Sequence, residues 1–488
     1  MSYRNPLHED RLVLLPVARS VFSRLCVCEV PGADRVLLEG SGTKNVYRVG
    51  EVGGDNDPDL YHLPFLFHSN GDPWKEANAY LLSLMRDKAP LSRRTDDVRR
   101  FASKLLDYLI FCEGNNLDWL DFSSARPPHR PTYKYFYSLI NGGGRCAAVI
   151  NQYTAVVYDF YKYISSNWYE LDMNRVDTTK QLRFVVKSPS GSRVVDVERR
   201  SQTRRTPPQS VAPIGFVRED GEDLRPLSNG ELGIFMDAIK DEKVFSAVER
   251  LILLTSLMTG ARKQTVLTMR LKHLISFQEN KLLPEGAYKL HAGPGTGIDT
   301  KKDKSQTLYF PKQLAEELVT LANSPIMRRR RIKLRAKLER SNPALPLDEG
   351  DSYLFVSNQG NAYYMAKSDP RYLIVKSPPT GQVTETIRRK LMSVAATGFP
   401  KDFSYHWLRA TYAYQIYQRL QILVRDGFMR PGEDIDFIQS RMHHESRETT
   451  ESYLKLFKMA HEKTIAQEIW EGKLFNYNCG ALNMDLQN

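Results

Sequence analysis

Residues 404–414 read SYHWLRATYAY, and residues 442–454 read MHHESRETTESYL. In the first stretch, His406 and Arg409 are three positions apart, a spacing that places two side chains on one face of a helix. Two groups that carry protons or positive charge on one face favour an anionic partner between them. The first stretch therefore predicts a helix that presents an anion-binding site.

A tyrosine closes the second stretch. Tyr453 follows His444 by nine residues, and the intervening Glu448-Thr449-Thr450 can cap a helix that carries the tyrosine. A tyrosine hydroxyl has an ordinary pKa near 10, so only about a thousandth of it is ionised at pH 7. It becomes a useful nucleophile only beside a base and strong positive charge. The histidines of the two stretches can act as the base, and Arg409 supplies positive charge.

Two more motifs lie upstream. Residues 259–262 read TGAR, and residues 299–308 read DTKKDKSQTL, a lysine-rich segment that leads into a predicted strand. Together the four motifs resemble the signature of the tyrosine recombinases (phage-integrase type), which reads T-G-x-R, T-K-x-x-K-S-x-T, H-x-L-R-x-T, a Gly-His pair and T-T-x-x-Y. The resemblance covers the chain from about Asp72 to Phe457.

The resemblance implies a DNA breaking-and-rejoining enzyme with a catalytic set of six residues. The set is Arg262, Lys301, His406, Arg409, His444 and Tyr453. It implies that the arginines clamp the scissile phosphate, that the lysine protonates the leaving 5′-hydroxyl, and that the tyrosine forms a 3′-phosphotyrosyl link. In the same way, His406 takes or relays the tyrosine proton, and His444 donates to the phosphate. Bond energy is conserved in the protein link, so no cofactor and no metal is expected. Lys302 and Lys304 remain alternatives to Lys301.

The sequence departs from the family pattern at three places. Thr265 stands where the family has an acidic residue that buttresses the site, and His443 replaces a small residue. A basic insert also separates the lysine motif from His406, and it is either a solvated helix or a source of extra phosphate contacts. The basic residues of the insert are Arg328–Arg331, Lys333, Arg335 and Lys337. The pair His443-His444 has only the adjacent, poorly placed Glu445 as a carboxylate neighbour, which argues against a metal site.

The bulk composition agrees with a folded DNA-binding protein. The chain has 488 residues, a formal net charge of +12 and five scattered cysteines. The length allows two to four domains, and the charge favours a polyanionic partner. The cysteine spacing argues against a disulfide framework. There is no apolar run long enough to span a membrane and no secretory signal. We therefore expect a cytoplasmic protein that works at the bacterial nucleoid.

The chain divides into five predicted segments. Helical periodicity, with apolar residues three or four apart, marks the second segment. Ser228 and Glu231 form a predicted capping box near the start of the fourth segment, and Gly260 is a predicted helix C-cap. The segments are an N-terminal appendage of unknown role (1–71), a helical core DNA-binding domain (72–175), a basic linker (176–222), the catalytic domain (223–475) and a tail (476–488).

The expected fold is multidomain and mainly α. A helical core-binding (SAM-like) domain precedes a mixed α/β, mostly helical tyrosine-recombinase catalytic domain with a small antiparallel sheet. The linker is either a solvated tether or a segment that tracks DNA.

We predict a site-specific DNA recombinase or integrase carried by a mobile element. The alternatives are a type IB topoisomerase-like relaxase and a non-catalytic DNA-binding protein on a recombinase scaffold. The expected partners are double-stranded DNA and further copies of the chain, as a homodimer on one site and a homotetramer in synapsis. Accessory DNA-bending or directionality proteins are further candidate partners, and no membrane is expected.

Overall fold

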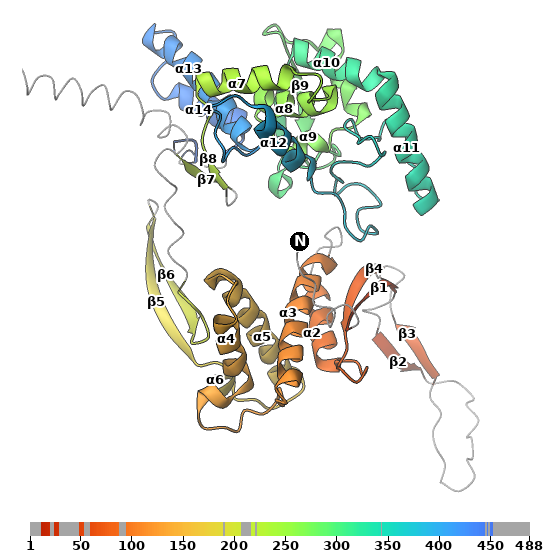
Figure 1. Ribbon diagram of the computed structural model, residues 1–488, viewed down its shortest axis with the longest axis vertical. Coiled ribbons are helices and arrows are strands. Elements are labelled where there is room, and N and C mark those ends of the chain that lie inside the picture. Colours follow the sequence, from red (N-terminus) through yellow and green to blue (C-terminus); the bar gives the residue numbers. More distant parts are fainter. Residues whose placement is uncertain are drawn as a thin grey trace, which may run out of the picture. The chain divides into compact units, whose positions relative to one another are not determined.

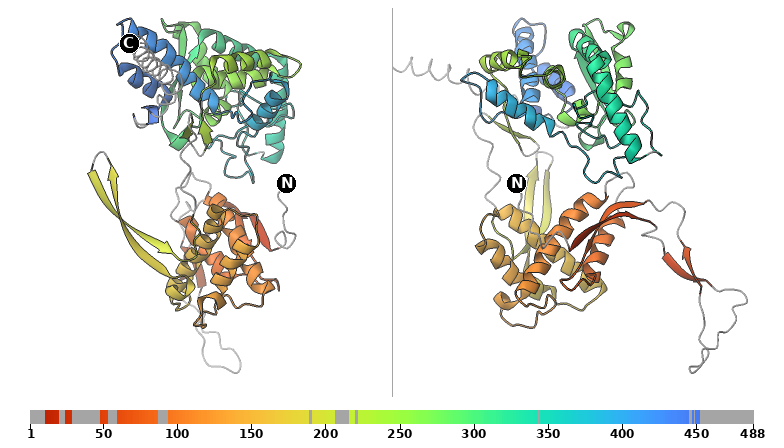
Figure 2. Two further views of the ribbon diagram at one scale, coloured as in Figure 1. Left: turned by 60° about the vertical axis from the view of Figure 1, so that its left-hand side comes forward. Right: turned by 45° about the vertical axis from the view of Figure 1, so that its right-hand side comes forward.

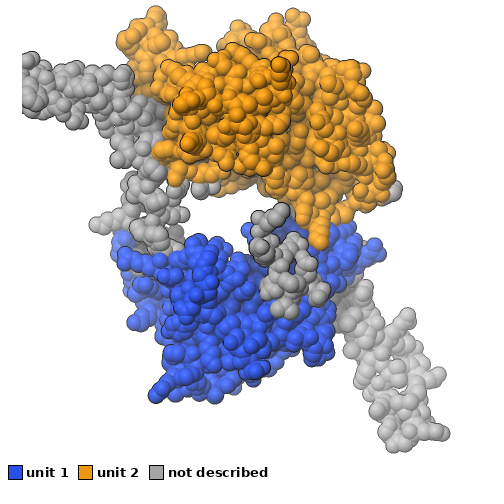
Figure 3. All heavy atoms as spheres, in the orientation of Figure 1, with its two compact units in different colours: residues 1–209 blue, residues 210–488 orange. Residues whose placement is uncertain are grey.

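The structure, a computed structural model, describes residues 11–19, 24–28, 48–52, 59–86, 94–188, 191–205, 216–219, 222–342, 344–444, 447 and 449–451. The chain forms two compact units, residues 1–209 and residues 210–488 (Figure 3). Both are mainly helical with small antiparallel two-stranded sheets, which is the predicted fold class. Of the helices in the described ranges, none has both the length and the apolar character that a membrane span requires.

The first unit is built on helices that enclose an apolar core (Figure 1). Its α5 buries Ile150, Val157, Tyr161 and Ile164, which recur at steps of three, four or seven and so share one face. Trp74, which precedes the helices, is fully buried. Its ring centroid lies 5.1 Å from that of Phe160 on α5. The helices are α2 (Lys75–Arg86), α3 (Arg94–Gly114), η1 (Pro127–His129), α4 (Pro131–Asn141), α5 (Ala147–Asn167) and α6 (Met173–Val176).

Two antiparallel strand pairs precede these helices. Strand β1 (Leu12–Ala18) pairs with β4 (Leu60–Leu66), and β2 (Arg24–Cys28) pairs with β3 (Arg48–Val52). Along β4 the leucines at 60, 63 and 66 are buried in the same core as the helices. The end of the predicted N-terminal appendage is therefore packed into the helical unit, because burial of its leucines against these helices removes apolar surface from water.

A hairpin occupies part of the predicted basic linker. Strand β5 (Thr179–Ser188) and strand β6 (Gly191–Arg200) pair antiparallel, from Thr179↔Arg200 to Ser188↔Gly191. This stretch is therefore regular structure and not an irregular tether. Its valines at 185, 186, 194, 195 and 197 have high strand propensity, which outweighs the charge and the turn residues that suggested a linker.

The second unit surrounds the second apolar core. The strands in its described residues form two hairpins, β7 (Val217–Glu219) with β8 (Glu222–Leu224) and β9 (Ala287–Ala292) with β10 (Gln306–Pro311). The helices before β9 are α7 (Asn229–Lys240), α8 (Ala247–Thr259), α9 (Lys263–Leu267), η2 (Leu271–Phe277) and η3 (Glu279–Lys281). Those after it are η4 (Lys301–Asp303), α10 (Lys312–Asn323), α11 (Pro325–Ser341), α12 (Val383–Val394), α13 (Trp407–Arg425) and α14 (Glu433–Met442).

The predicted helix ends of this unit are confirmed. The side chain of Ser228 accepts from the main-chain N–H of Glu231, and the Glu231 side chain accepts from that of Ser228, which is a capping box. Helix α8 ends at Gly260 in the left-handed conformation, with φ of 68°. The basic insert is a regular helix, α11, since its run of arginines and lysines contains good helix formers.

Candidate active site

The TGAR motif forms a rigid corner between two helices. Gly260 ends α8, and Arg262 is the N-cap of α9. The hydroxyl of Ser256 donates to the carbonyl of Ala261 at 2.9 Å, and the N–H of Ala261 bonds to the Thr259 hydroxyl at 3.2 Å. Both bonds are buried, so the backbone that carries Arg262 is held in one conformation.

Arg409 connects this corner to the histidine loop. The side chain lies on α13 and the residue is 3% exposed. Its Nη1 donates to the carbonyl of Gly260, and its Nη2 donates to the carbonyl of Met442. A planar guanidinium can bridge two carbonyl groups in this way because its N–H donors point in fixed, diverging directions. His406, the N-cap residue of α13, begins the helix three residues earlier.

The loop after α14 carries two histidines that make different contacts. His443 is in the left-handed conformation at φ 53°, and its Nε2 lies 3.0 Å from the carbonyl oxygen of Thr307 on β10. His444 is buried, and its Nδ1 lies 3.0 Å from the Thr450 hydroxyl. His443, which stands where the tyrosine-recombinase pattern has a small residue, therefore links this loop to β10.

The electrostatics of the loop reflect a cluster of cations. Burial lowers the pKa of His443, and the nearby charges of Arg409, Arg262 and Arg441 lower it further. The hydrogen bond to Thr307 opposes these effects. The lowered pKa favours the neutral form of His443, and three of the chain's arginines contribute to it together.

The lysine motif lies in the connection between β9 and β10. Thr300 is buried, whereas Lys301 is half-buried and Lys304 is exposed, so Lys301 is the less solvated of the two. Lys302 has φ of 57° and Asp303 has φ of 53°, which reverses the chain directly after Lys301. This placement favours Lys301 over Lys304 as the lysine of the site.

Thr265 stands where the tyrosine-recombinase pattern has an acidic residue, and its side chain acts as a hydrogen-bond donor, whereas an acidic side chain would accept. Its hydroxyl donates to the carbonyl of Asp299 at 2.9 Å, which fixes α9 to the start of the lysine segment. The Asp299 carboxylate accepts from the main-chain N–H of Lys367 at 3.0 Å. The main-chain N–H of Asp299 donates to the Thr268 hydroxyl at 2.9 Å. Burial raises the pKa of Asp299. This buried carboxyl group was missed in the sequence, where its position directly before Thr300-Lys301 was the available signal.

Arg441 is a second residue that the motifs did not single out. Its guanidinium carbon lies 3.4 Å from the centroid of the Tyr309 ring and 4.9 Å from that of Phe437. Stacking on an aromatic face holds an arginine while leaving its N–H edge available to an anion. In the sequence, Arg441 immediately precedes Met442-His443-His444, which was the only signal for it.

A cavity of about 840 Å³ opens beside the first two motifs. Its lining includes Arg262, His406 and Lys401, together with Arg388 from α12. A larger groove of about 1280 Å³, lined by α7, α8, α10 and α13, contains none of the predicted site residues. The smaller cavity is therefore the one of these two that adjoins the TGAR corner and His406.

Of the six predicted site residues, five lie in the described ranges and belong to these connected segments. Arg409 links the TGAR corner and the histidine loop, and His443 links that loop to β10. The sixth residue, Tyr453, lies outside the described residues, which end with a helical segment at Glu451. Among the residues that are described, no three His, Cys, Asp or Glu side chains are grouped as metal ligands.

A scan of protein-family models and a search of curated proteins found no match to this sequence. Comparison with solved structures found several similar proteins, among them the following three. The Tn1549 transposon integrase (residues 82–397) in complex with circular intermediate DNA is 13% identical, and the match covers 80% of this chain and 98% of the solved integrase chain, with a TM-score of 0.39. XerH site-specific recombinase bound to difH substrate is 15% identical, covering 81% and 89% with a TM-score of 0.39. A lambda integrase dimer bound to a core site is 11% identical, covering 78% and 94% with a TM-score of 0.35. All three are named as integrases or recombinases.

Proposed function

We propose that this protein is a site-specific DNA recombinase or integrase that uses Tyr453 as its nucleophile. The observation that carries the proposal is the position of Arg409. One buried guanidinium donates to Gly260, beside Arg262, and to Met442, beside the two histidines. Motifs separated by 149 and by 33 residues are thereby joined at one point. A chance resemblance of short motifs would not bring their backbones together.

The chemistry follows from the residue types. Forked N–H donors of Arg262 and Arg409 match the two non-bridging oxygens of a phosphodiester. These oxygens gain negative charge as phosphorus becomes five-coordinate, so donors held in place beforehand lower the barrier. The Tyr453 oxygen attacks phosphorus and forms the 3′-phosphotyrosyl bond, while the bond to the deoxyribose 5′-oxygen breaks. That oxygen takes a proton from Lys301 and leaves as a free 5′-hydroxyl.

The histidines complete the proton balance in this proposal. His406 takes or relays the proton that Tyr453 loses, and His444 donates to the phosphate. Attack by a 5′-hydroxyl from another strand then reverses the step and exchanges the strands. Exchange between two duplexes requires a cut on each of four strands, so we propose a homodimer on each site and a homotetramer in synapsis. The chain would act in the cytoplasm on the DNA of a mobile element.

The test uses a duplex that spans the junctions of the DNA flanking the gene, with a nick placed to trap cleaved product. The wild-type protein should form a covalent protein–DNA adduct that survives SDS, and Tyr453→Phe should bind the duplex without forming it. Tyr137→Phe, at a tyrosine 45% exposed in the first unit, is the control and should form the adduct normally.

Three outcomes would contradict the proposal in different ways. An adduct in Tyr453→Phe would rule out this nucleophile. Wild-type protein that binds the duplex without forming any adduct would indicate a DNA-binding protein on a recombinase scaffold. Relaxation of supercoiled DNA by a monomer, without strand exchange, would indicate a relaxase.

A further inference from the structure

The hairpin of β5 and β6 is a long ribbon that extends away from the helices of its own unit (Figure 2). It contains ten consecutive residue pairs. At about 3.3 Å per residue, ten residues span roughly 30 Å. A two-stranded ribbon of this kind is marginally stable by itself in water. Contacts at the base of the ribbon must therefore supply much of the stability of the paired strands.

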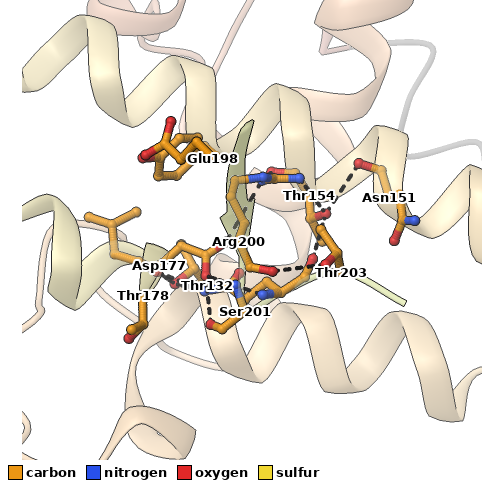
Figure 4. Close-up of polar contacts among 12 residues, drawn as sticks. Thr132, Asn151, Thr154, Asp177, Thr178, Glu198, Arg200, Ser201 and Thr203 are labelled. Atoms are coloured by element: carbon orange, nitrogen blue, oxygen red, sulfur yellow. Dashed lines mark hydrogen bonds and ion pairs between the residues drawn. The ribbon is translucent and has the colours of Figure 1, made fainter. Parts of the chain in front are cut away.

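The base is locked by a buried polar cluster (Figure 4). The carboxylate of Asp177, before β5, accepts from the Ser201 hydroxyl at 2.6 Å and from the Ser201 and Gln202 N–H groups at 3.0 and 3.1 Å. The Gln202 amide, after β6, donates to the carbonyl of Val176 at 2.7 Å and to the Thr132 hydroxyl at 3.1 Å. The residues on both sides of the ribbon are thus bonded to each other and to α4.

Arg200 adds a second attachment, to α5. Its Nη1 donates to the carbonyl of Thr154 at 2.8 Å, and its guanidinium carbon lies 5.2 Å from the centroid of the Tyr158 ring (Figure 4 shows Arg200 between Asp177 and Thr154). Because buried, hydrogen-bonded polar groups are costly to separate, these contacts hold the base of the ribbon against α4 and α5. The ribbon is a projecting arm with a rigid base.

The ribbon carries a surplus of positive charge. Residues 179–200 include two acidic residues, and both are paired with cations. Asp196 lies 2.9 Å from Arg183, and Glu198 lies 3.7 Å from Lys162 on α5. The cationic residues of the ribbon are Lys180, Arg183, Lys187, Arg193, Arg199 and Arg200. This surplus favours a polyanion as the partner of the arm.

An apolar pair lies farther along the ribbon. Val185 and Val194 are direct cross-strand partners, and their exposed fractions are 58% and 56%. Exposed apolar residues on a ribbon with free edges carry a risk of aggregation. A partner that covers them, while meeting the positive charge, would remove that risk.

We propose that the β5–β6 ribbon is a DNA-contacting arm that enters the major groove of the duplex bound by this protein. The major groove is wide enough to admit a two-stranded β-ribbon. Exposed Lys180 and Arg199, which are cross-strand partners, contact phosphates. The Val185–Val194 pair packs on thymine methyl groups, the apolar feature of that groove. The proposal rests on the proposed function, because it needs a duplex bound to the full chain.

The test measures binding of the full chain to a labelled 60-base-pair duplex of random sequence over a range of salt concentrations. Lys180→Ala with Arg199→Ala should weaken binding about tenfold and should flatten the slope of log affinity against log salt by about 1.8, the value for two lost phosphate contacts. The control, Lys75→Ala with Arg126→Ala, removes two exposed cations from the same unit and should leave affinity near that of the wild type. An equal loss in both double variants would mean that overall charge acts, and the proposal fails.

A second variant keeps the charge of the ribbon and changes only its apolar pair. Val185→Ser with Val194→Ser should weaken binding to an A·T-rich duplex more than to a G·C-rich duplex, with unchanged circular dichroism and unfolding midpoint. If it instead abolishes self-association in sedimentation and leaves DNA affinity unchanged, the arm docks on a second copy of the chain and the proposal is wrong. Wild-type protein that binds no duplex would overturn the proposed function, and the ribbon proposal with it.

Discussion

The guanidinium of Arg409 is hydrogen bonded to the main-chain carbonyl of Gly260, 149 residues earlier in the chain. Gly260 is two positions before Arg262, so the bond fixes the distance between the segments that carry the two arginines. It also uses two Arg409 nitrogens for structure, since the other donates to Met442. Arg409 therefore positions the corner and the histidine loop in addition to its proposed contact with phosphate.

Substitution of the two arginines by lysine separates these roles. Arg262→Lys should slow cleavage by about 10² or more with little change in unfolding midpoint, because it keeps the charge and loses the fork. Arg409→Lys should show a similar loss and also a lower unfolding midpoint, because one amine cannot reach both carbonyl groups. Cleavage rates with the nicked duplex and thermal unfolding would measure both effects. Arg419→Lys, at an exposed position on the same helix, is the control, and near-normal cleavage by both site variants would place the phosphate elsewhere.

The corner itself depends on a glycine. A Cβ atom at residue 260 would lie 2.5 Å from Cδ1 of Tyr412, and the φ of 68° is one that alanine adopts at a cost of about 1–2 kcal/mol. Gly260→Ala should therefore lower the unfolding midpoint by several degrees. It should also reduce cleavage, because a shift of the backbone at residue 260 moves both Arg262 and the Gly260 carbonyl that accepts from Arg409. Gly233→Ala, at an exposed position inside α7 with no atom within 4 Å of the new Cβ, should be neutral or stabilising by about 0.5–1 kcal/mol. Equal effects of the two substitutions would contradict this account.

Lys301 is expected to protonate the leaving 5′-oxygen. A duplex with sulfur at the bridging 5′ position has a leaving group that needs no proton. Lys301→Ala should thus be slow on ordinary DNA and largely restored on the sulfur-substituted duplex, as measured by single-turnover cleavage. Lys304→Ala is the matched control, because Lys304 lies in the same segment and is exposed. Restoration in the Lys304 variant alone would assign the proton transfer to that residue.

The lowered pKa of His443 predicts that the folded protein loses stability in mild acid. Its pKa in the folded protein is lowered by burial and by Arg409, Arg262 and Arg441, whereas in the unfolded chain it is near 6.5. The unfolded state therefore binds more protons below about pH 6.5, and the free energy of unfolding falls as pH decreases from there. His443→Gln should flatten this dependence in urea unfolding between pH 7.5 and 5.5, whereas His129→Gln, at an exposed histidine, should not. An unchanged slope in His443→Gln would mean that other groups take up the proton.

Local signals in the sequence predicted local structure well. The capping box at Ser228 and Glu231 and the C-cap at Gly260 were confirmed because they depend on residues three or four apart. The β5–β6 ribbon was misjudged, because turn residues and charge at its ends concealed the strand propensity of its valines. Asp299 and Arg441 were missed, since their importance comes from neighbours far away in the sequence.

The sequence by itself determined the order of the motifs, the residue types available for phosphate chemistry, and the helices on which several of them lie. Only the tertiary structure decided that Arg409 bonds to Gly260 and Met442, that Thr265 bonds to the Asp299 carbonyl, and that His443 bonds to Thr307. The physical reason is the range of the interactions. Helix periodicity and capping act over one turn, whereas these bonds join a side chain to a main-chain carbonyl far away in the sequence, and the packing of the whole unit sets the positions of both.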